Sequence, residues 1–227
     1  MSVAAILVAA GTGHRLGADR PKAFVELAGA PLFVHAVQRL LAADSVVVVV
    51  PAGLVEQARL LLQSWPAVRC VAGGASRHDS VAAGLAALPA AARTVLVHDA
   101  ARCLAPPSLA AAVASAVREG HPAVVPGLAI TDTIKQVSAD GTVTSTLDRA
   151  VLRAIQTPQG FDRAVLEQAH RRVGPGSHPG SHPGSHTDDA ELVSASGYPV
   201  LVIPGDPLAI KITTPADLAY AGWLLAS

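Results

Sequence analysis

The feature that most constrains the fold is a regular alternation of short apolar runs with longer helix-like segments. The runs predicted to be strands, several of them rich in valine, are Val3–Ala9, Ser45–Val50, Val68–Ala72, Thr94–His98 and Ala123–Val125. Runs of this kind are typical of parallel strands, because helices cover both faces of the sheet and no polar alternation is needed. The stretches between them predicted to be helices are Leu32–Ala43, Leu54–Ser64, Asp79–Leu88 and Ser108–Glu119. The pattern predicts an α/β fold, a doubly wound, mostly parallel, Rossmann-like sheet with helices on both faces.

The alternation changes after residue 130. Threonine and valine alternate through residues 131–147 around Asp140–Gly141, which is typical of a β-hairpin. We expect a projecting hairpin arm at about 131–149, which can pair with a second subunit. The remaining expected elements are strands at Arg153–Gln156 and Val200–Ile203, helices near Asp162–Val173 and Asp188–Ser196, and a last helix from Pro215 capped by Thr214.

Length and composition limit the class of protein. With 227 residues, 51% hydrophobic and 3% aromatic, the chain is long enough for a substantial aliphatic core. We expect one domain spanning residues 1–227. The formal net charge is zero, so no overall positive field exists to attract nucleic acid. An anion site must therefore be a local cluster.

Targeting and redox signals favour a cytoplasmic protein. No segment reaches the roughly 18 consecutive apolar residues that a membrane helix needs. The N-terminal apolar run has no basic flank and no convincing cleavage site. Cys70 and Cys103 stand alone without a C-x-x-C spacing, so neither a disulfide framework nor a zinc site is expected.

Residues 175–186 repeat the tetrapeptide Pro-Gly-Ser-His three times. Proline and glycine prevent the helix that would bring the histidines onto one face. We interpret residues 174–186 as a flexible loop. A metal site made by the three histidines is the alternative.

In a doubly wound sheet, ligands bind beyond the carboxyl ends of the strands, which directs attention to the loops at 10–22, 73–78 and 99–106. The first loop contains Gly11, Gly13 and Gly17, but residue 16 is Leu, so the dinucleotide pattern G-x-G-x-x-G is not met. The strand at 45–50 is followed by proline instead of an acidic residue, and no Gly-Lys-Ser/Thr of a Walker loop occurs.

What remains in this loop is a cluster of cations beside flexible glycines. Arg15, Arg20 and Lys22 lie within eight residues and are offset only by Asp19, which suits a polyphosphate. The alternative is an ordinary basic surface loop. The chain has fourteen arginines but only three lysines, Lys22, Lys135 and Lys211. Lysine placed where arginine is otherwise preferred indicates a need for a compact point charge, and chance is the alternative.

Two further loops have the marks of a site. Gly73 and Gly74 follow a predicted strand, Arg77 is within reach of a phosphate, and Ser76, Asp79 or Ser80 can cap the next helix. A plain tight turn with an N-cap is the alternative. Asp99 ends another predicted strand, where one carboxylate together with phosphate oxygens would hold Mg²⁺, unless it only caps a turn.

Seven segments match one family in order along nearly the whole chain. They are LVAAGTGHRLGADRPK, AGGASRHDSV, VLVHDAAR, DTIK, LDR, QTPQGF and IKITTPADL. The chain resembles the 2-C-methyl-D-erythritol 4-phosphate cytidylyltransferases of the non-mevalonate isoprenoid pathway. The first loop alone indicates only the wider sugar-phosphate nucleotidyltransferases, and the later motifs make the resemblance specific.

The resemblance implies transfer of CMP from CTP to methylerythritol phosphate, with Mg²⁺ as cofactor and a homodimer formed through the arm. It implies that the catalytic cations are Arg15, Lys22 and Lys211, and that Asp99 holds the metal. It implies that the nucleotide is bound by Ala9, Ala10, Gly11, Gly13, Gly73, Gly74, Ser80 and Ala100. It implies that the acceptor substrate is bound by Arg102, Thr133, Arg149, Thr157 and Thr187.

Two other functions fit the same loops. One is a related cytidylyltransferase that acts on ribitol 5-phosphate. The other is a regulatory protein on the same fold that binds a nucleotide without catalysis. Pyrophosphate release with each acceptor distinguishes the three.

Overall fold

The computed structural model describes residues 2–11, 20–173 and 188–226. Within these residues, eight strands form one mixed sheet. They are β1 (Ser2–Val8), β4 (Ser45–Val50), β5 (Val68–Ala72), β6 (Ala92–Asp99), β7 (Ala123–Ala129), β10 (Arg153–Ile155), β11 (Gln159–Asp162) and β12 (Val200–Pro204). Two shorter ribbons pair β2 (Glu26–Leu27) with β3 (Ala30–Pro31) and β8 (Lys135–Val137) with β9 (Val143–Thr146).

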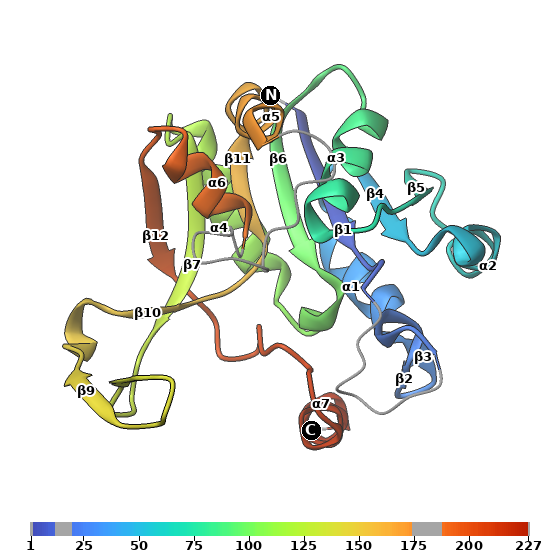
Figure 1. Cartoon of the computed structure of the whole chain (residues 1–227). Coiled ribbons are helices and arrows are strands. Elements are labelled where there is room, and N and C mark those ends of the chain that lie inside the picture. The colour runs from blue at the N-terminus through green and yellow to red at the C-terminus, as the bar shows by residue number, and fades with distance from the viewer. Residues whose placement is uncertain (1, 12–19, 174–187, 227) are drawn as a thin grey trace.

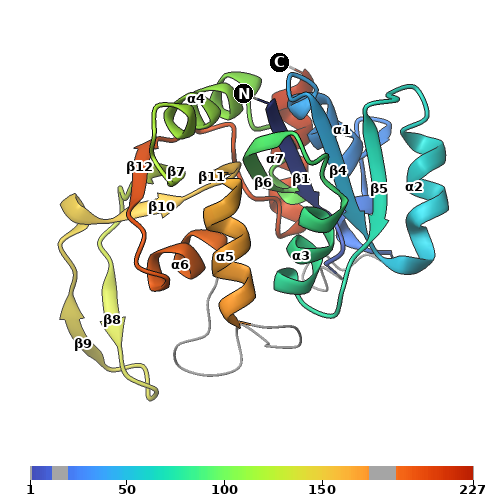
Figure 2. The same ribbon diagram turned by 90° about the horizontal axis from the view of Figure 1, so that it is seen from above.

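Helices cover both faces of the sheet, as Figures 1 and 2 show. Their bounds are α1 (Leu32–Leu40), α2 (Val55–Leu61), α3 (Arg77–Ala87), α4 (Pro107–Arg118), α5 (Arg163–Val173), α6 (Asp189–Ala195) and α7 (Pro215–Ala226). Residues of α1 and α4 belong to the core on one face, and residues of α3, α5 and α6 to the core on the other. The predicted doubly wound α/β architecture is confirmed.

The position of β1 decides where a ligand can enter. The strand order is β10-β7-β11-β6-β1-β4-β5, and β12 pairs in parallel with residues Ala123–Gly127 of β7. From β1 the chain first builds β4 and β5 on one side, then returns to place β6 on the other, and β1 is parallel to both neighbours. The connections after β1 and β6 therefore diverge, which opens a crevice at their carboxyl ends. There Val8 of β1 pairs in register with Asp99 of β6.

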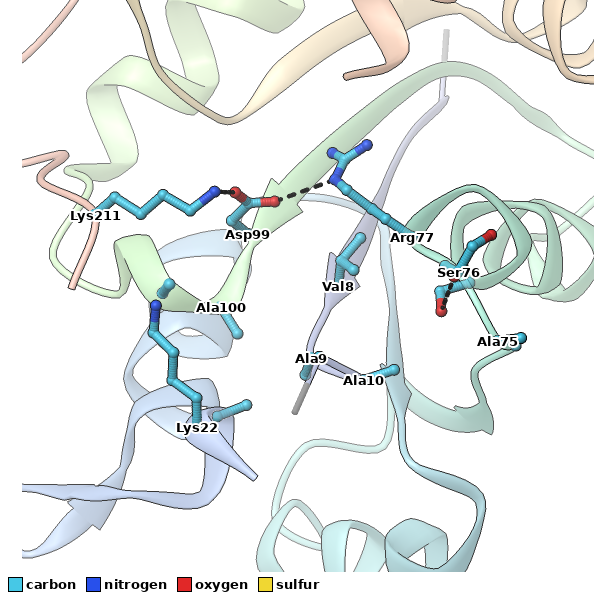
Figure 3. A pocket seen from close by; sticks show the side chains of 15 residues that line it. Val8, Ala9, Ala10, Lys22, Ala75, Ser76, Arg77, Asp99, Ala100 and Lys211 are labelled. Atoms are coloured by element: carbon cyan, nitrogen blue, oxygen red, sulfur yellow. Dashed lines mark hydrogen bonds and ion pairs between the residues drawn. The ribbon is translucent and has the colours of Figure 1, made fainter. Parts of the chain in front are cut away.

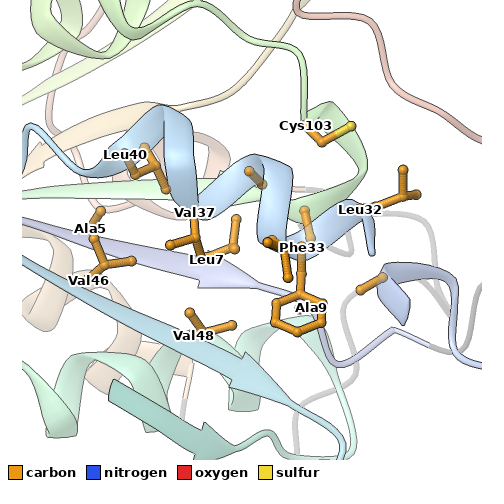
Figure 4. Packing of buried hydrophobic residues seen from close by; sticks show 14 of the residues in the cluster. Ala5, Leu7, Ala9, Leu32, Phe33, Val37, Leu40, Val46, Val48 and Cys103 are labelled. Atoms are coloured by element: carbon orange, nitrogen blue, oxygen red, sulfur yellow. The ribbon is translucent and has the colours of Figure 1, made fainter. Parts of the chain in front are cut away.

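The packing of α1 on β1 and β4 shows why the apolar runs form a buried sheet (Figure 4). Phe33 and Val37 of α1 have no exposed surface and lie over Leu7 and Val48 of the sheet. These helix positions are four residues apart, so they share one face of the helix. A fully buried apolar side chain of this kind contributes about 1.5–3 kcal/mol to the free energy of folding.

The sequence prediction missed one central strand. β11 lies between β6 and β7 and is antiparallel to both. It has four residues and begins just after Pro158, a composition that predicts a turn. Gly160 is needed there because a Cβ would lie 2.4 Å from Val113 of α4, which crosses above the strand. Tertiary packing therefore makes this segment a strand of the sheet, although its sequence predicts a turn.

The predicted hairpin is present as β8 and β9 and extends away from the body of the molecule (Figure 2). Gly141 has φ of +85°, a conformation that glycine adopts without strain. The Asp140 carboxylate accepts hydrogen bonds from the Ser138 hydroxyl at 2.6 Å and from the Thr142 N–H at 3.0 Å. These local hydrogen bonds and the glycine therefore define the turn at the end of the arm.

Among the helices of the described residues, none is long and apolar enough to cross a membrane.

Candidate active site

A cavity of about 360 Å³ opens at the carboxyl ends of β1 and β6, in the crevice that the strand order creates. Its walls also include the 3₁₀ helix Lys22–Phe24, the turn before α3 and the loop that follows β12. Six of the predicted nucleotide-binding residues line it: Ala9, Ala10, Gly11, Gly74, Ser80 and Ala100. The predicted charged residues Lys22, Asp99 and Lys211 line the same cavity, so segments far apart in sequence meet here.

Lys22 is held at the cavity by the residues that follow it. Ala23 and Phe24 are buried, and the Phe24 ring packs against Phe33 of α1 with ring centroids 4.8 Å apart. This anchor fixes the backbone at the start of the 3₁₀ helix. The Lys22 side chain then extends along the cavity wall toward Ala100 (Figure 3). An apolar anchor thereby places a positive charge at the cavity.

Asp99 lies between two cations (Figure 3). Its carboxylate is 2.7 Å from the Lys211 ammonium and 3.6 Å from Nε of Arg77. Burial by itself raises the pKa of this carboxyl group, but Arg77 and Lys211 outweigh burial and hold the pKa well below its usual range. Asp99 is therefore ionised at neutral pH.

The turn before α3 brings backbone to the cavity. A Cβ on Gly73 would lie 2.6 Å from the Ala10 Cβ, and one on Gly74 would lie 2.3 Å from the Asp79 Cβ. Both positions therefore require glycine. Ser76 caps α3: its hydroxyl accepts from the Asp79 N–H at 3.0 Å, and the Asp79 carboxylate accepts from the Ser76 N–H at 3.1 Å. This capping box fixes the turn next to the cavity.

Known proteins identify the family. The family model of 2-C-methyl-D-erythritol 4-phosphate cytidylyltransferase matches residues 3–227. The chain belongs to this family.

Individual relatives are similar to this chain along almost its whole length. A 2-C-methyl-D-erythritol 4-phosphate cytidylyltransferase from Nocardia farcinica is 51% identical over 227 residues, which cover 99% of this chain and 94% of the relative. The crystal structure of the same-named protein from Thermus thermophilus has a TM-score of 0.78 at 33% identity and covers 100% of both chains. That of 4-diphosphocytidyl-2C-methyl-D-erythritolsynthase from Anaerococcus prevotii has a TM-score of 0.85 at 27% identity, covering 100% of this chain and 96% of that one.

The residues that family resemblance implies for the acceptor lie outside the lining of this cavity, as far as the structure describes them. Arg102 donates to the carbonyls of Ala209 at 2.7 Å and Ile155 at 3.1 Å, which ties the loop of Lys211 to β10. Thr133 and Arg149 are exposed at the base of the arm. Gly13, Arg15 and Thr187, along with the 175–186 repeat, fall outside the described residues.

Thr157 is buried and contacts Asp99, the candidate metal ligand. Its hydroxyl oxygen accepts from the Asp99 N–H at 3.0 Å and lies 2.8 Å from Nδ1 of His98. Burial lowers the pKa of His98 to about 4, so the imidazole is neutral at pH 7. In this structure Thr157 supports the end of β6, while its predicted role toward the acceptor stays a prediction.

The sequence indicated that Arg77 can reach a phosphate, but Arg77 was not among the residues predicted for the site. It lines the cavity and pairs with Asp99. A signal was present, because Arg77 is the first residue of α3 after a Gly-Gly turn. Its second partner, Asp189, begins α6 and was not singled out in the sequence.

A divalent cation fits the donor chemistry of Asp99. Its hard carboxylate oxygens are ionised and line the cavity, which suits Mg²⁺. Within the described residues, no group of three or more His, Cys, Asp and Glu side chains is arranged to hold a metal. A Mg²⁺ ion at Asp99 would therefore take its other ligands from substrate phosphates and water.

Proposed function

We propose that this chain transfers CMP from CTP to 2-C-methyl-D-erythritol 4-phosphate and releases pyrophosphate. Membership of the family supports this activity over the full length of the chain. The structural observation that most supports this activity is the cavity at the carboxyl ends of β1 and β6. Lys22, Arg77 and Lys211 line this cavity together with the ionised carboxylate of Asp99. We also propose that the chain acts as one nucleotidyltransferase domain, since one sheet runs through it.

The reaction depends on alignment of the two phosphate groups and on positive charge around them, and it needs no general base. The nucleophile is an oxygen of the acceptor's phosphate monoester, which is largely ionised at pH 7 because its second pKa is about 6. This oxygen forms a bond to the α-phosphorus of CTP as the bond from that phosphorus to the β-phosphate oxygen breaks. Pyrophosphate leaves with the electron pair, so no side chain must remove a proton. The barrier lies in bringing two anions into line and stabilising the charge that develops.

The cations of the cavity supply that stabilisation. Lys22 and Lys211 reach the cavity from opposite ends of the chain, and we assign Arg15 to the same task by family resemblance. Backbone at Ala9, Ala10, Gly11 and the Gly73–Gly74 turn gives the nucleotide a surface free of bulky side chains. Mg²⁺ bound at Asp99 would neutralise phosphate charge and polarise the α-phosphate.

We assign the acceptor to the side of the cavity that faces the arm. Arg102, Thr133, Arg149, Thr157 and Thr187 are the candidates by family resemblance. The arm carries exposed apolar side chains, including Val137 at 54% and Val143 at 55% exposure. Exposed valines on an isolated two-stranded ribbon favour burial against a second subunit. A homodimer formed through the arm would bring Thr133 and Arg149 to the acceptor of the partner.

The deciding experiment measures pyrophosphate release from CTP and Mg²⁺ with each acceptor in turn. We expect turnover with methylerythritol phosphate, little with ribitol 5-phosphate, and none when the metal is removed by EDTA. A preference for ribitol 5-phosphate would identify the related transferase. CTP binding without pyrophosphate release from any acceptor would identify a non-catalytic nucleotide-binding protein.

A further inference from the structure

Arg77 connects two carboxylates that come from different parts of the fold. Its Nε is 3.6 Å from Asp99 at the end of β6, and its terminal nitrogen is 2.6 Å from Asp189 at the start of α6. The Arg77 side chain is 31% exposed and lines the cavity, whereas that of Asp189 is only 1% exposed. One end of the guanidinium is therefore held in the protein interior while the other faces the site.

Asp189 is itself held in place. Its second carboxylate oxygen is 2.9 Å from Nε2 of His170 on α5. The His170 ring is stacked on His78 of α3, with ring centroids 4.3 Å apart and an interplanar angle of 12°. Both oxygens of Asp189 thus have partners on packed helices. Burial by itself raises the pKa of Asp189, but Arg77 and His170 together outweigh burial and lower it, so the carboxylate is charged.

Lys211 is held differently from Arg77. Its ammonium pairs with Asp99 at 2.7 Å, its side chain is 46% exposed, and it lies on the loop between β12 and α7. When a polyphosphate enters, Lys211 can turn from Asp99 to the phosphates at small cost, because it stays in a polar, partly solvated site. Moving Arg77 away would take the guanidinium partner from the buried Asp189 carboxylate and leave only His170 beside it among the contacts described above, which is strongly unfavourable.

We propose that Asp189 is a positioning residue that anchors Arg77 beside Asp99, so that Lys211 is the cation released to the incoming triphosphate. Without the anchor, the Arg77 guanidinium is free to turn fully onto Asp99 and to compete with the metal and phosphates for that carboxylate. The inference rests on the proposed function, because it assumes that CTP occupies this cavity.

A double-mutant cycle tests the anchor. CTP binding in the presence of Mg²⁺ is measured by calorimetry for wild type, Asp189→Asn, Arg77→Gln and the double variant, with steady-state kinetics in parallel. We expect Asp189→Asn to weaken CTP binding about 10- to 100-fold, as is typical for a group that orients a ligand-binding residue. In the Arg77→Gln background the same change should have little further effect. An equal loss in both backgrounds would overturn the proposal, because Asp189 would then act without Arg77.

A second variant keeps the test valid if Asp189→Asn does not fold. Arg77→Lys retains the positive charge at a partly exposed position, but a single ammonium cannot span Asp99 and Asp189 as the planar guanidinium does. We expect Arg77→Lys to bind CTP more weakly than wild type does, and wild-type binding by Arg77→Lys would refute the anchor.

Asp188→Asn is the matched control for the loss of one negative charge. Its carboxylate accepts hydrogen bonds from Gln159 at 2.8 Å and from the Glu191 N–H, and asparagine still caps α6. We expect it to bind CTP nearly as wild type does, and a loss equal to that of Asp189→Asn would count against the proposal.

The activity of the wild-type enzyme distinguishes failure of the proposed function from failure of the anchor. If it releases no pyrophosphate with any acceptor, the proposed function fails, whereas an additive cycle in an active enzyme refutes only the anchor.

Discussion

At the scale of single residues, the use of lysine carries information about the site. Two of the three lysines of the chain, Lys22 and Lys211, line the same cavity although they lie near opposite ends of the sequence. The third, Lys135, is on the arm and donates to Thr146. A lysine ammonium is a compact, flexible charge, whereas arginine suits fixed pairing. The structure shows this contrast directly, because Arg77 is fixed between two carboxylates and Lys211 pairs with one.

Lys22→Ala and Arg15→Ala are expected to be nearly inactive while remaining folded. Loss of one preorganised charge next to the transition state reduces kcat by about 10²- to 10³-fold. Pyrophosphate release gives the rate, and the thermal unfolding midpoint shows that the fold is intact. Arg118→Ala, which removes an exposed charge at the end of α4, is the control. Near-normal turnover in either Lys22→Ala or Arg15→Ala would refute the assignment.

The two cysteines are expected to be unreactive in the folded protein. Both are free and buried, and burial raises the pKa of Cys70 to about 11 and that of Cys103 to about 12. Because the thiolate is the reactive form, alkylation at pH 8 should be negligible and should increase only as the pH approaches these values. Mass spectrometry after iodoacetamide treatment should show no label on the native protein and two labels in denaturant. Rapid labelling of native protein at pH 8 would contradict the burial.

At the scale of elements, α3 has two tasks that constrain its sequence. Its first residues face the cavity, and its middle packs on the sheet through Gly84. A Cβ on Gly84 would lie 2.5 Å from Cγ2 of Ile6 in β1 and 3.2 Å from Val49 in β4. The close approach of helix and sheet at this point keeps the start of α3 next to the end of β1.

Gly84→Ala is therefore expected to destabilise the protein, although alanine is the better helix former. Overpacking costs about 1–3 kcal/mol and the better helix propensity of alanine offsets about 1 kcal/mol, so a net loss of up to about 2 kcal/mol should appear in urea unfolding. Gly53→Ala is the matched control, because nothing lies within 4 Å of its Cβ position. It should be neutral or slightly stabilising. A Gly84→Ala variant as stable as Gly53→Ala would mean that α3 packs less closely than described.

At the scale of the whole molecule, the arm is the part that the body does not stabilise. β8 and β9 form a separate two-stranded sheet, and their residues are almost all exposed. Such a ribbon is marginal in water on its own. A second subunit would bury Val137 and Val143 and would link the arm to catalysis.

Val143→Asp is expected to convert a dimer into a monomer. A charge at the centre of an apolar contact opposes its burial, so light scattering after size exclusion should show half the wild-type mass. The monomer should still bind CTP but should use the acceptor poorly, because Thr133 and Arg149 lie at the base of the arm. Thr144→Asp places the same charge on the opposite face of β9 and should leave the dimer intact. A wild-type monomer at every concentration would rule out the proposed dimer.

The sequence alone determined most of the element order apart from β11, together with the hairpin, the capped helices and three loops at the carboxyl ends of strands. These features depend on local patterns, such as valine runs, paired glycines and N-cap residues, which act over a few positions. Lys22 and Asp99 were found in the same way, as charges next to such patterns, whereas Lys211 was found through the scarcity of lysine in the chain and the family resemblance. Family motifs then supplied the chemistry that local patterns alone left open.

Only the tertiary structure decided which distant groups meet. β11 became a strand because it fills the space between β6 and β7, and Thr157 turned inward to support Asp99. Arg77 and Asp189 lie 112 positions apart, and no periodicity connects them. A buried ion pair forms where the fold removes two charges from water together, because each alone would be costly to bury. That physical condition exists only once the helices have packed, which is why the anchor of the site could not be read from the sequence.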